Sequence, residues 1–392
     1  MSAIYRAIVQ GDLPQAIAAA NLRRASLRSK PDEVYRIARV FLELGRRDEL
    51  LDWCADLRLS PQYRFFAGYQ LALALRDRGV AAGAAAAEAC RDLTGSERDQ
   101  IAKLLGVPSQ PGADLPPPRH IAICGASFCG STLFDIVMNG LPGVRTIGES
   151  HWLIKGWLDR KTIAYDVANP LGDHVPQCRS CGAGCPVLTP QFRIRLLADP
   201  ANWYGKIARQ LDARVLISAD KNLPKITLND PCLRFDAIVL YKSPLQAWAS
   251  QAPRCPAAAD AAGHFDQMTA YLSQWRTVYA ELIDPFRPAG RKIFVNFDWL
   301  TIDPFNTFQA VTSALDLPFQ ADLLRAISPG HSIGGNRGTL HKVLSSDRAL
   351  KIEPLGAPAI PASHRRWIEE HQETRDLYQA LNARAIGPQP AA

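Results

Sequence analysis

The chain has 392 residues, of which 47% are apolar and 21% are charged, so it can form two domains and bury a substantial core. This balance excludes general disorder, and since no apolar run reaches 18 residues, we expect no membrane-spanning helix. The net charge of +7 suits an anionic ligand, but Lys and Arg do not form the dense runs typical of nucleic-acid-binding proteins.

The cysteines and the N-terminus indicate the compartment. Nine cysteines, an odd number scattered through a long chain, are unlike the framework of a secreted disulfide-rich domain. The first residues, MSAIYRAIVQGD, become charged too early for a secretory leader. We therefore expect a cytoplasmic protein.

Residues 1–106 predict an all-α domain, because Ala, Leu and Arg dominate and strand-forming residues do not alternate. Gly11, Gly45 and Gly79 are spaced 34 residues apart. Five residues after each glycine comes Ala16, Leu50 or Ala84, at a position where the two helices of a hairpin would touch. The segment QGDLPQAIAAA (residues 10–20) resembles the turn and second helix of a tetratricopeptide repeat, a family of this period. The resemblance implies a helical-repeat domain that recruits a protein partner or acceptor. An irregular helical domain with chance glycine spacing is the alternative.

Residues 107–118 contain five prolines and predict a stiff linker, which is followed by a second domain over residues 119–392. There, short apolar strands alternate with helices, which is typical of an α/β fold whose parallel sheet has helices on both faces. We expect strands at 120–124, 214–219, 236–242 and 291–297, and helices at 131–140, 245–251, 265–283 and 304–315. Ligands of such sheets bind at the carboxyl ends of the strands.

The first of these strands runs into a glycine-rich loop, GASFCGST, over residues 125–132. Two glycines with this spacing before a helix are typical of a loop that binds phosphate through backbone N–H groups. Ser131 occupies the position where a nucleoside triphosphatase carries its lysine, so a nucleotide kinase is a less favoured function. A purely structural strand-to-helix turn is also compatible with the glycine pair.

The segment from His120 to Trp152 resembles the phosphosulfate loop of bacterial sulfotransferases, which use 3′-phosphoadenosine 5′-phosphosulfate (PAPS) and have a P-loop-related fold. Further similar segments follow in the same order, at residues 218–221, 240–250, 297–304 and 332–337. The resemblance implies transfer of a sulfuryl group from PAPS to a hydroxyl of a carbohydrate, a lipid or a tyrosine, leaving 3′-phosphoadenosine 5′-phosphate (PAP).

The resemblance also implies roles for particular residues. An acceptor hydroxyl must lose its proton during transfer, and Glu149 lies where related enzymes carry their catalytic glutamate, with His151 as the second candidate base. Lys221 would stabilise the charge that develops on the leaving phosphate, although a surface lysine paired with Asp220 is the alternative. The residues expected to bind PAPS are Ser127, Phe128, Cys129, Gly130, Ser131 and Thr132 in the loop, Lys242 and Ser250 at the 3′-phosphate, and Arg337.

Several positions depart from the family pattern. Phe128 replaces the usual basic residue of the loop, Cys129 replaces its serine neighbour, and Lys242 and Ser243 replace an Arg-Asp pair. A lysine keeps the charge of an arginine but loses its bidentate geometry. A binding or scaffold protein that has lost catalysis and works through its helical repeats is therefore the alternative function.

Cys178, Cys181 and Cys185 lie close together in the sequence QCRSCGAGCPVL, and His174 precedes them by four residues. Three cysteines and a histidine are the ligands of a Cys₃His zinc site. The spacing also fits a redox-sensitive or disulfide-paired loop, so the sequence leaves both alternatives open.

Overall fold

The computed structural model describes both helical and sheet-forming parts of the chain. The described residues are 3–27, 30–57, parts of 67–81, 118–153, 178–189 except 183, 192, 196, 202–255 except 232, 261–284, 289–320, 322–324, 330–336, 339, and 352–388 except 358. They divide into two compact units. The first unit comprises Met1–Pro118, Ser150–Leu211 and Pro224–Leu233, and the second comprises Arg119–Glu149, Asp212–Leu223 and Arg234–Ala392.

The first unit begins with five helices, α1 (Ala3–Val9), α2 (Leu13–Leu22), α3 (Arg24–Leu27), α4 (Pro31–Glu43) and α5 (Arg47–Leu57). Gly11 separates α1 from α2 and Gly45 separates α4 from α5, both with positive φ angles, of 72° and 68°. This left-handed conformation favours glycine and ends a helix. Ala16 and Leu50, the expected hairpin contacts, are buried, whereas Ala84 lies outside the described residues. Gly11 and Gly45 therefore each mark a turn between two consecutive helices.

The N-terminal helices share their core with later segments of the same unit. Arg39, on α4, is fully buried and lies 3.5 Å from the carboxylate of Asp230. Its guanidinium also lies over the ring of Trp203, which begins α12 (Trp203–Gln210). The backbone N–H of Asn202 donates to Glu43 Oε1. The first unit thus extends beyond the predicted helical domain, while the predicted linker, apart from Pro118, lies outside the described residues.

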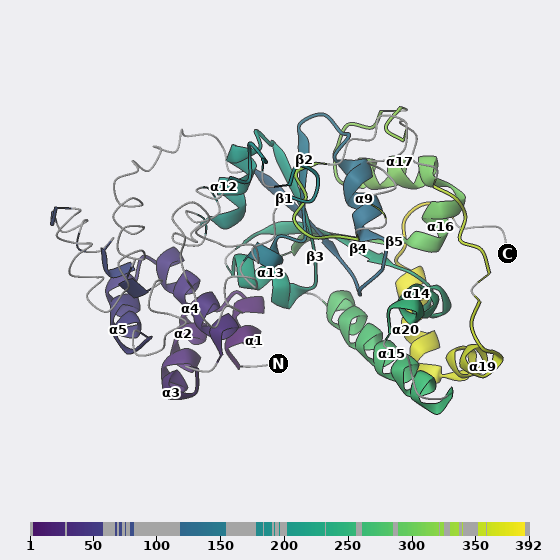
Figure 1. Ribbon diagram of the computed structural model, residues 1–392, viewed down its shortest axis with the longest axis horizontal. Coiled ribbons are helices and arrows are strands. Elements are labelled where there is room, and N and C mark those ends of the chain that lie inside the picture. Colours follow the sequence, from purple (N-terminus) through teal and green to yellow (C-terminus); the bar gives the residue numbers. More distant parts are fainter. Residues whose placement is uncertain are drawn as a thin grey trace. The chain divides into compact units, whose positions relative to one another are not determined.

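The second unit is built on a five-stranded sheet with the order β2-β3-β1-β4-β5, in which every paired strand is parallel (Figure 1). The strands are β1 (Arg119–Cys124), β2 (Val144–Gly148), β3 (Val215–Lys221), β4 (Phe235–Tyr241) and β5 (Ala289–Asn296). The predicted α/β class and all four predicted strands are confirmed. The edge strand β2 was not predicted, because it is short and its central residues Arg145 and Thr146 interrupt the apolar pattern.

Helices cover the two faces of this sheet. Alternate strand residues, such as Ile123 and Leu240, pack against α9 (Ser131–Met138), α16 (Phe297–Ile302) and α17 (Pro304–Ala314). The neighbouring residue Tyr241 points to the opposite face, where it contacts α15 (Ala261–Ile283) through Tyr279 and α20 (Gln372–Asn382) through Asn382. Shorter helices α13 (Leu223–Asn229), α14 (Pro244–Gln251) and α19 (Ala362–Glu370) complete the described fold. Among the described helices, none combines the length and apolar character needed to cross a bilayer.

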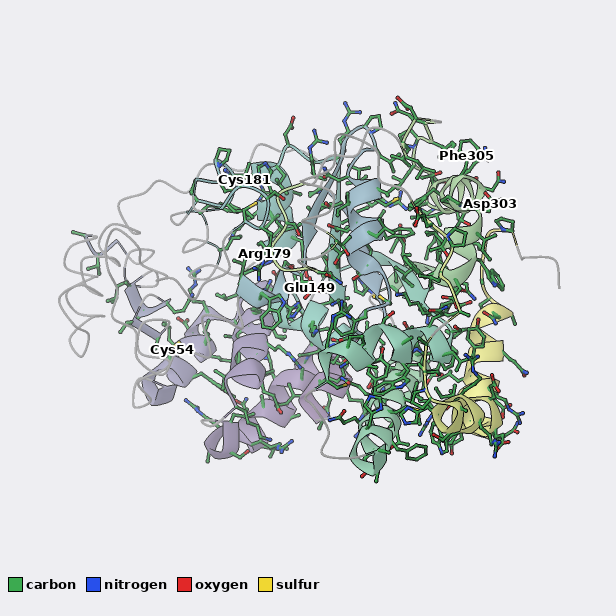
Figure 2. The ribbon with its side chains drawn as sticks, turned by 45° about the vertical axis from the view of Figure 1, so that its right-hand side comes forward. Cys54, Glu149, Arg179, Cys181, Asp303 and Phe305 are labelled. Carbon is green, nitrogen blue, oxygen red and sulfur yellow. The ribbon has the colours of Figure 1, made fainter. Side chains whose placement is uncertain are left out.

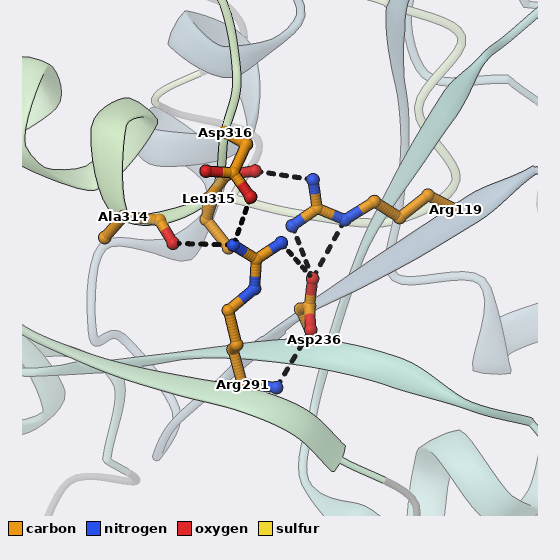
Figure 3. A network of polar contacts seen from close by, with 6 residues as sticks. All are labelled: Arg119, Asp236, Arg291, Ala314, Leu315 and Asp316. Carbon is orange, nitrogen blue, oxygen red and sulfur yellow. Dashed lines mark hydrogen bonds and ion pairs between the residues drawn. The ribbon is translucent and has the colours of Figure 1, made fainter.

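Charged side chains join the amino ends of three strands (Figure 3). Asp236, near the start of β4, accepts from the guanidinium of Arg119 on β1 at 2.5 Å and lies 3.4 Å from that of Arg291 on β5. Arg291 also bonds Asp316, just after α17, at 2.5 Å. These pairs link β1, β4 and β5 at the amino edge of the sheet.

Candidate functional site

The glycine-rich loop leaves β1 at the point where the strand order reverses, since β3 lies on one side of β1 and β4 on the other. Phe128 has a φ of +64° and Gly130 a φ of +99°, so the chain turns sharply before α9 begins at Ser131. The loop is held from behind, where the N–H of Gly125 donates to the carbonyl of Lys221 and that of Ala126 donates to Tyr279 Oη. The N-terminus of α9 therefore opens at the carboxyl edge of the sheet, where anions are favoured.

Glu149 and Lys221 form an ion pair, with Lys221 Nζ 2.5 Å from Glu149 Oε1. Glu149 follows directly after β2, at the position labelled in Figure 2, and Lys221 is the last residue of β3. Because β2 and β3 are paired parallel strands, the two residues reach the same edge of the sheet. Lys221 adopts a φ of +72°, a strained conformation that proteins retain chiefly at functional sites.

The backbone that leads into Glu149 is hydrogen-bonded to the segment 330–336. The N–H of Glu149 donates to the carbonyl of Ile333, and the N–H of Ile333 donates to the carbonyl of Ile147. Gly148 has a φ of +70°, and a Cβ there would lie 2.3 Å from Ser332 Oγ. The carboxylate of Glu149 is thus presented by a backbone with little freedom to move.

Two carboxylic acids behind the site are buried, Asp135 on α9 and Asp220 on β3. Burial, together with the nearby charges of Glu149 and Asp220, raises the pKa of Asp135 to about 8, against the lowering hydrogen bonds of Thr146 and Gly148. Asp135 is therefore mostly protonated at pH 7. Of these neighbouring acids, Glu149 alone lines the cavity described below.

A second group of cations follows β4. Lys242 is 8% exposed, and its Nζ donates to Ser250 Oγ at 3.0 Å and lies 4.9 Å from the ring centre of Phe297. Burial lowers the pKa of Lys242, and the charge of Arg254 lowers it further, while Cys129 and Asp298 raise it. Arg254 lies 4.4 Å over the ring of Phe128 and donates to the carbonyl of Ser250. Two like charges are thus held close together, which favours an anion between them.

These groups line one cavity of about 470 Å³ at the carboxyl edge of the sheet, a volume typical of small-molecule sites. All of its lining residues belong to the second unit. They are Phe128, Gly130, Ser131, Thr132, Leu133, Glu149, Lys221, Lys242, Ser250, Arg254, Phe297, Gly335, Asn336 and Thr339. Three cationic side chains and one carboxylate line this cavity, so its charge favours an anionic ligand, and we refer to it as the anion cavity.

Most of the residues expected from the sequence come together in this cavity, namely Phe128, Gly130, Ser131, Thr132, Glu149, Lys221, Lys242 and Ser250. Others do not line it. The carbonyl of Ser127 accepts from Tyr271 Oη, Cys129 is buried beneath the loop, and His151 packs beside Trp152. Burial raises the pKa of Cys129, so its thiol is a weak nucleophile. Arg337 lies outside the described residues.

Arg254 is the lining cation that sequence reasoning missed. It follows Ser250 by four residues, one helical turn, in the short 3-10 helix that continues α14. That spacing from a predicted phosphate ligand is the signal that was available. Phe297 was noted only as part of a similar segment. A Cβ on Gly130 would lie 2.1 Å from the ring of Phe297. Glycine at position 130 therefore lets the loop backbone pack directly against this ring.

A separate cluster of cysteine side chains lies in the first unit. The sulfur atoms of Cys178, Cys181 and Cys185 are within 4.8 Å of one another, and none of the three is in a disulfide. Three thiols this close together could hold a metal ion. His174, the histidine expected from the sequence, lies outside the described residues.

A scan of the chain against protein-family models gives no match, and a search of curated proteins gives no similar sequence.

Proposed function

We propose that the chain is a sulfotransferase that moves a sulfuryl group from PAPS to the hydroxyl of a carbohydrate, a lipid or a tyrosine. The observation that carries this proposal is the pairing of Glu149 with Lys221 in a cavity that is otherwise cationic. Sulfuryl transfer needs a base for the acceptor proton and a cation for the leaving phosphate. A carboxylate and an ammonium group side by side supply both.

The nucleotide end of PAPS carries phosphate at its 5′ and 3′ positions, and the cavity offers cations at two places. The backbone N–H groups at the start of α9 and the hydroxyls of Ser131 and Thr132 suit the 5′-phosphosulfate. Lys242 and Ser250, with Arg254 beside them, suit the 3′-phosphate.

The transfer step then proceeds as an in-line displacement at sulfur. The acceptor oxygen forms a bond to sulfur and gives its proton to Glu149, while the bond from sulfur to the bridging phosphate oxygen breaks. The electron pair of that bond stays on the phosphate, and Lys221 and the N–H groups of the loop stabilise the negative charge that develops there. In the structure Lys221 is paired with Glu149. Binding of the phosphosulfate must therefore break this ion pair, so that the carboxylate of Glu149 is able to accept a proton.

Two alternatives make different predictions. A nucleotide kinase needs a cation on the γ-phosphate, but Ser131 stands at the lysine position of the loop. A binding or scaffold protein would bind PAP in the same cavity without transferring sulfate. Measuring binding and transfer on one preparation separates these functions.

The experiment is calorimetry with PAP, AMP and ATP, followed by a transfer assay with radiolabelled PAPS against glycan, lipid and tyrosine-peptide acceptors. We expect PAP to bind far more tightly than AMP and one acceptor class to become labelled. Equal affinities for PAP and AMP would contradict the proposal, tight PAP binding without transfer would favour the scaffold function, and phosphoryl transfer from ATP would favour the kinase.

A further inference from the structure

The loop from Cys178 to Leu188 has the geometry of a short metal-binding knuckle. The chain reverses between Cys178 and Gly182, which form an isolated antiparallel bridge with the N–H of Gly182 donating to the carbonyl of Cys178. Gly182 has a φ of +67°, so glycine is favoured directly after Cys181. The turn brings the sulfur atoms of Cys178 and Cys181 to the same side of the loop.

Cys185 completes this arrangement from the next turn. Its sulfur atom lies within 4.8 Å of the other two and accepts a hydrogen bond from the backbone N–H of Leu188 at 3.2 Å. A backbone N–H directed at sulfur stabilises negative charge on that atom, and metal ligands are commonly oriented by such bonds. Cys178 and Cys185 are buried while Cys181 is exposed, so an ion could enter from the side of Cys181 (labelled in Figure 2).

We propose that Cys178, Cys181 and Cys185 bind a structural zinc ion. Three thiolates from one short loop, completed by a fourth protein ligand, form the closed tetrahedral set that marks a structural rather than a catalytic zinc. Each thiol loses its proton to solvent as the ion binds. The site involves none of the residues that line the anion cavity, so it does not depend on the proposed sulfuryl transfer.

His174 precedes Cys178 by four residues in the sequence and is the nitrogen ligand that the sequence offers for the fourth position. A disulfide between two of the three cysteines would exclude the proposed site.

The first test uses the full-length wild-type protein, purified in metal-free buffer. We expect one zinc per chain by elemental analysis, and removal of the zinc by a chelator should make three more thiols reactive. No zinc, or an intact mass two hydrogens lower than that of the fully reduced chain, would overturn the proposal. This test needs no variant, so it does not depend on whether a variant folds.

The second test identifies the ligands. Cys178→Ser, Cys181→Ser and Cys185→Ser should each lose zinc, whereas Cys255→Ser, outside the loop, should keep it. With cobalt in place of zinc, we expect the intense visible bands of tetrahedral thiolate coordination, and a shift of these bands in His174→Ala would identify that histidine as the fourth ligand. Zinc retained by the three loop variants, or a cobalt spectrum without these bands, would overturn the site.

Discussion

At the scale of single residues, the close pairing of Glu149 with Lys221 makes Glu149→Gln the most direct test of the mechanism. The amide has nearly the same shape but accepts no proton, so transfer from PAPS should fall by about 10²–10⁴-fold. PAP should bind at least as tightly as to the wild type, because Lys221 is no longer paired with a carboxylate. A kcat near the wild-type value would show that Glu149 is not the base and would return His151 to consideration.

Arg254 gives a second prediction at this scale, for ligand specificity. Its guanidinium lies beside Ser250 and over Phe128, so Arg254→Ala should weaken PAP by about ten- to a hundred-fold, the value of one charge-assisted hydrogen bond. AMP, which lacks the 3′-phosphate, should lose much less affinity. The matched control is Arg365→Ala, an exposed arginine paired with Glu369 outside the cavity. Equal losses for PAP and AMP in calorimetry would assign Arg254 to another phosphate.

His120 yields a prediction about stability against pH. It is buried on β1 beside Ser218, and burial lowers its pKa from 6.5 to about 3, against the raising effect of Asp220. His120 therefore binds a proton near pH 6.5 in the unfolded chain, but only near about pH 3 in the folded chain. As the pH falls from 6.5 towards 3, the folded state should lose up to about 1.4 kcal/mol per pH unit through this residue. His120→Gln should flatten that slope in denaturant titrations between pH 6.5 and 5, and an unchanged slope would contradict the assignment.

At the scale of elements, the glycine-rich loop depends on contact between Gly130 and the ring of Phe297. Gly130→Ala would place a Cβ 2.1 Å from that ring in a backbone with a φ of +99°. We expect about 1–3 kcal/mol of destabilisation and a loss of PAP binding, because the loop must move away from α16. Gly356→Ala, where nothing lies within 4 Å, is the control. Normal PAP binding by Gly130→Ala would mean that the N–H groups of the loop do not hold phosphate.

The elements that sequence reasoning found and missed differ in the strength of their local pattern. Strands β1, β3, β4 and β5 have central apolar runs, and parallel pairing then places Lys221 and Lys242 at one edge of the sheet. Strand β2 lacks such a run, so its existence depends on pairing with β3, which no local pattern specifies. The contact of Arg254 with Phe128 is likewise tertiary. The sequence could therefore identify Lys221 and Lys242, which follow from apolar strands, but not Arg254, which lies just after α14.

At the scale of the whole molecule, the two units should respond to different perturbations. The first unit depends on the buried pair of Arg39 and Asp230, with exposed fractions of 0% and 5%. The lining of the anion cavity belongs entirely to the second unit. A ligand stabilises the part of a protein that binds it. PAP should therefore stabilise the second unit against unfolding, whereas a substitution of Arg39 should lower the stability of the first unit.

Arg39→Leu in the full-length chain tests this independence by scanning calorimetry. Removing the guanidinium breaks the buried ion pair with Asp230, and breaking a buried pair from one side typically costs about 3–5 kcal/mol. We expect one unfolding transition to move to lower temperature, while a second remains in place and rises with PAP. Arg46→Leu, which breaks the exposed pair with Glu49, should cost about 0–1 kcal/mol and serves as the control. A single transition, lowered by Arg39→Leu and raised by PAP, would mean that the two units unfold together and would contradict their independence.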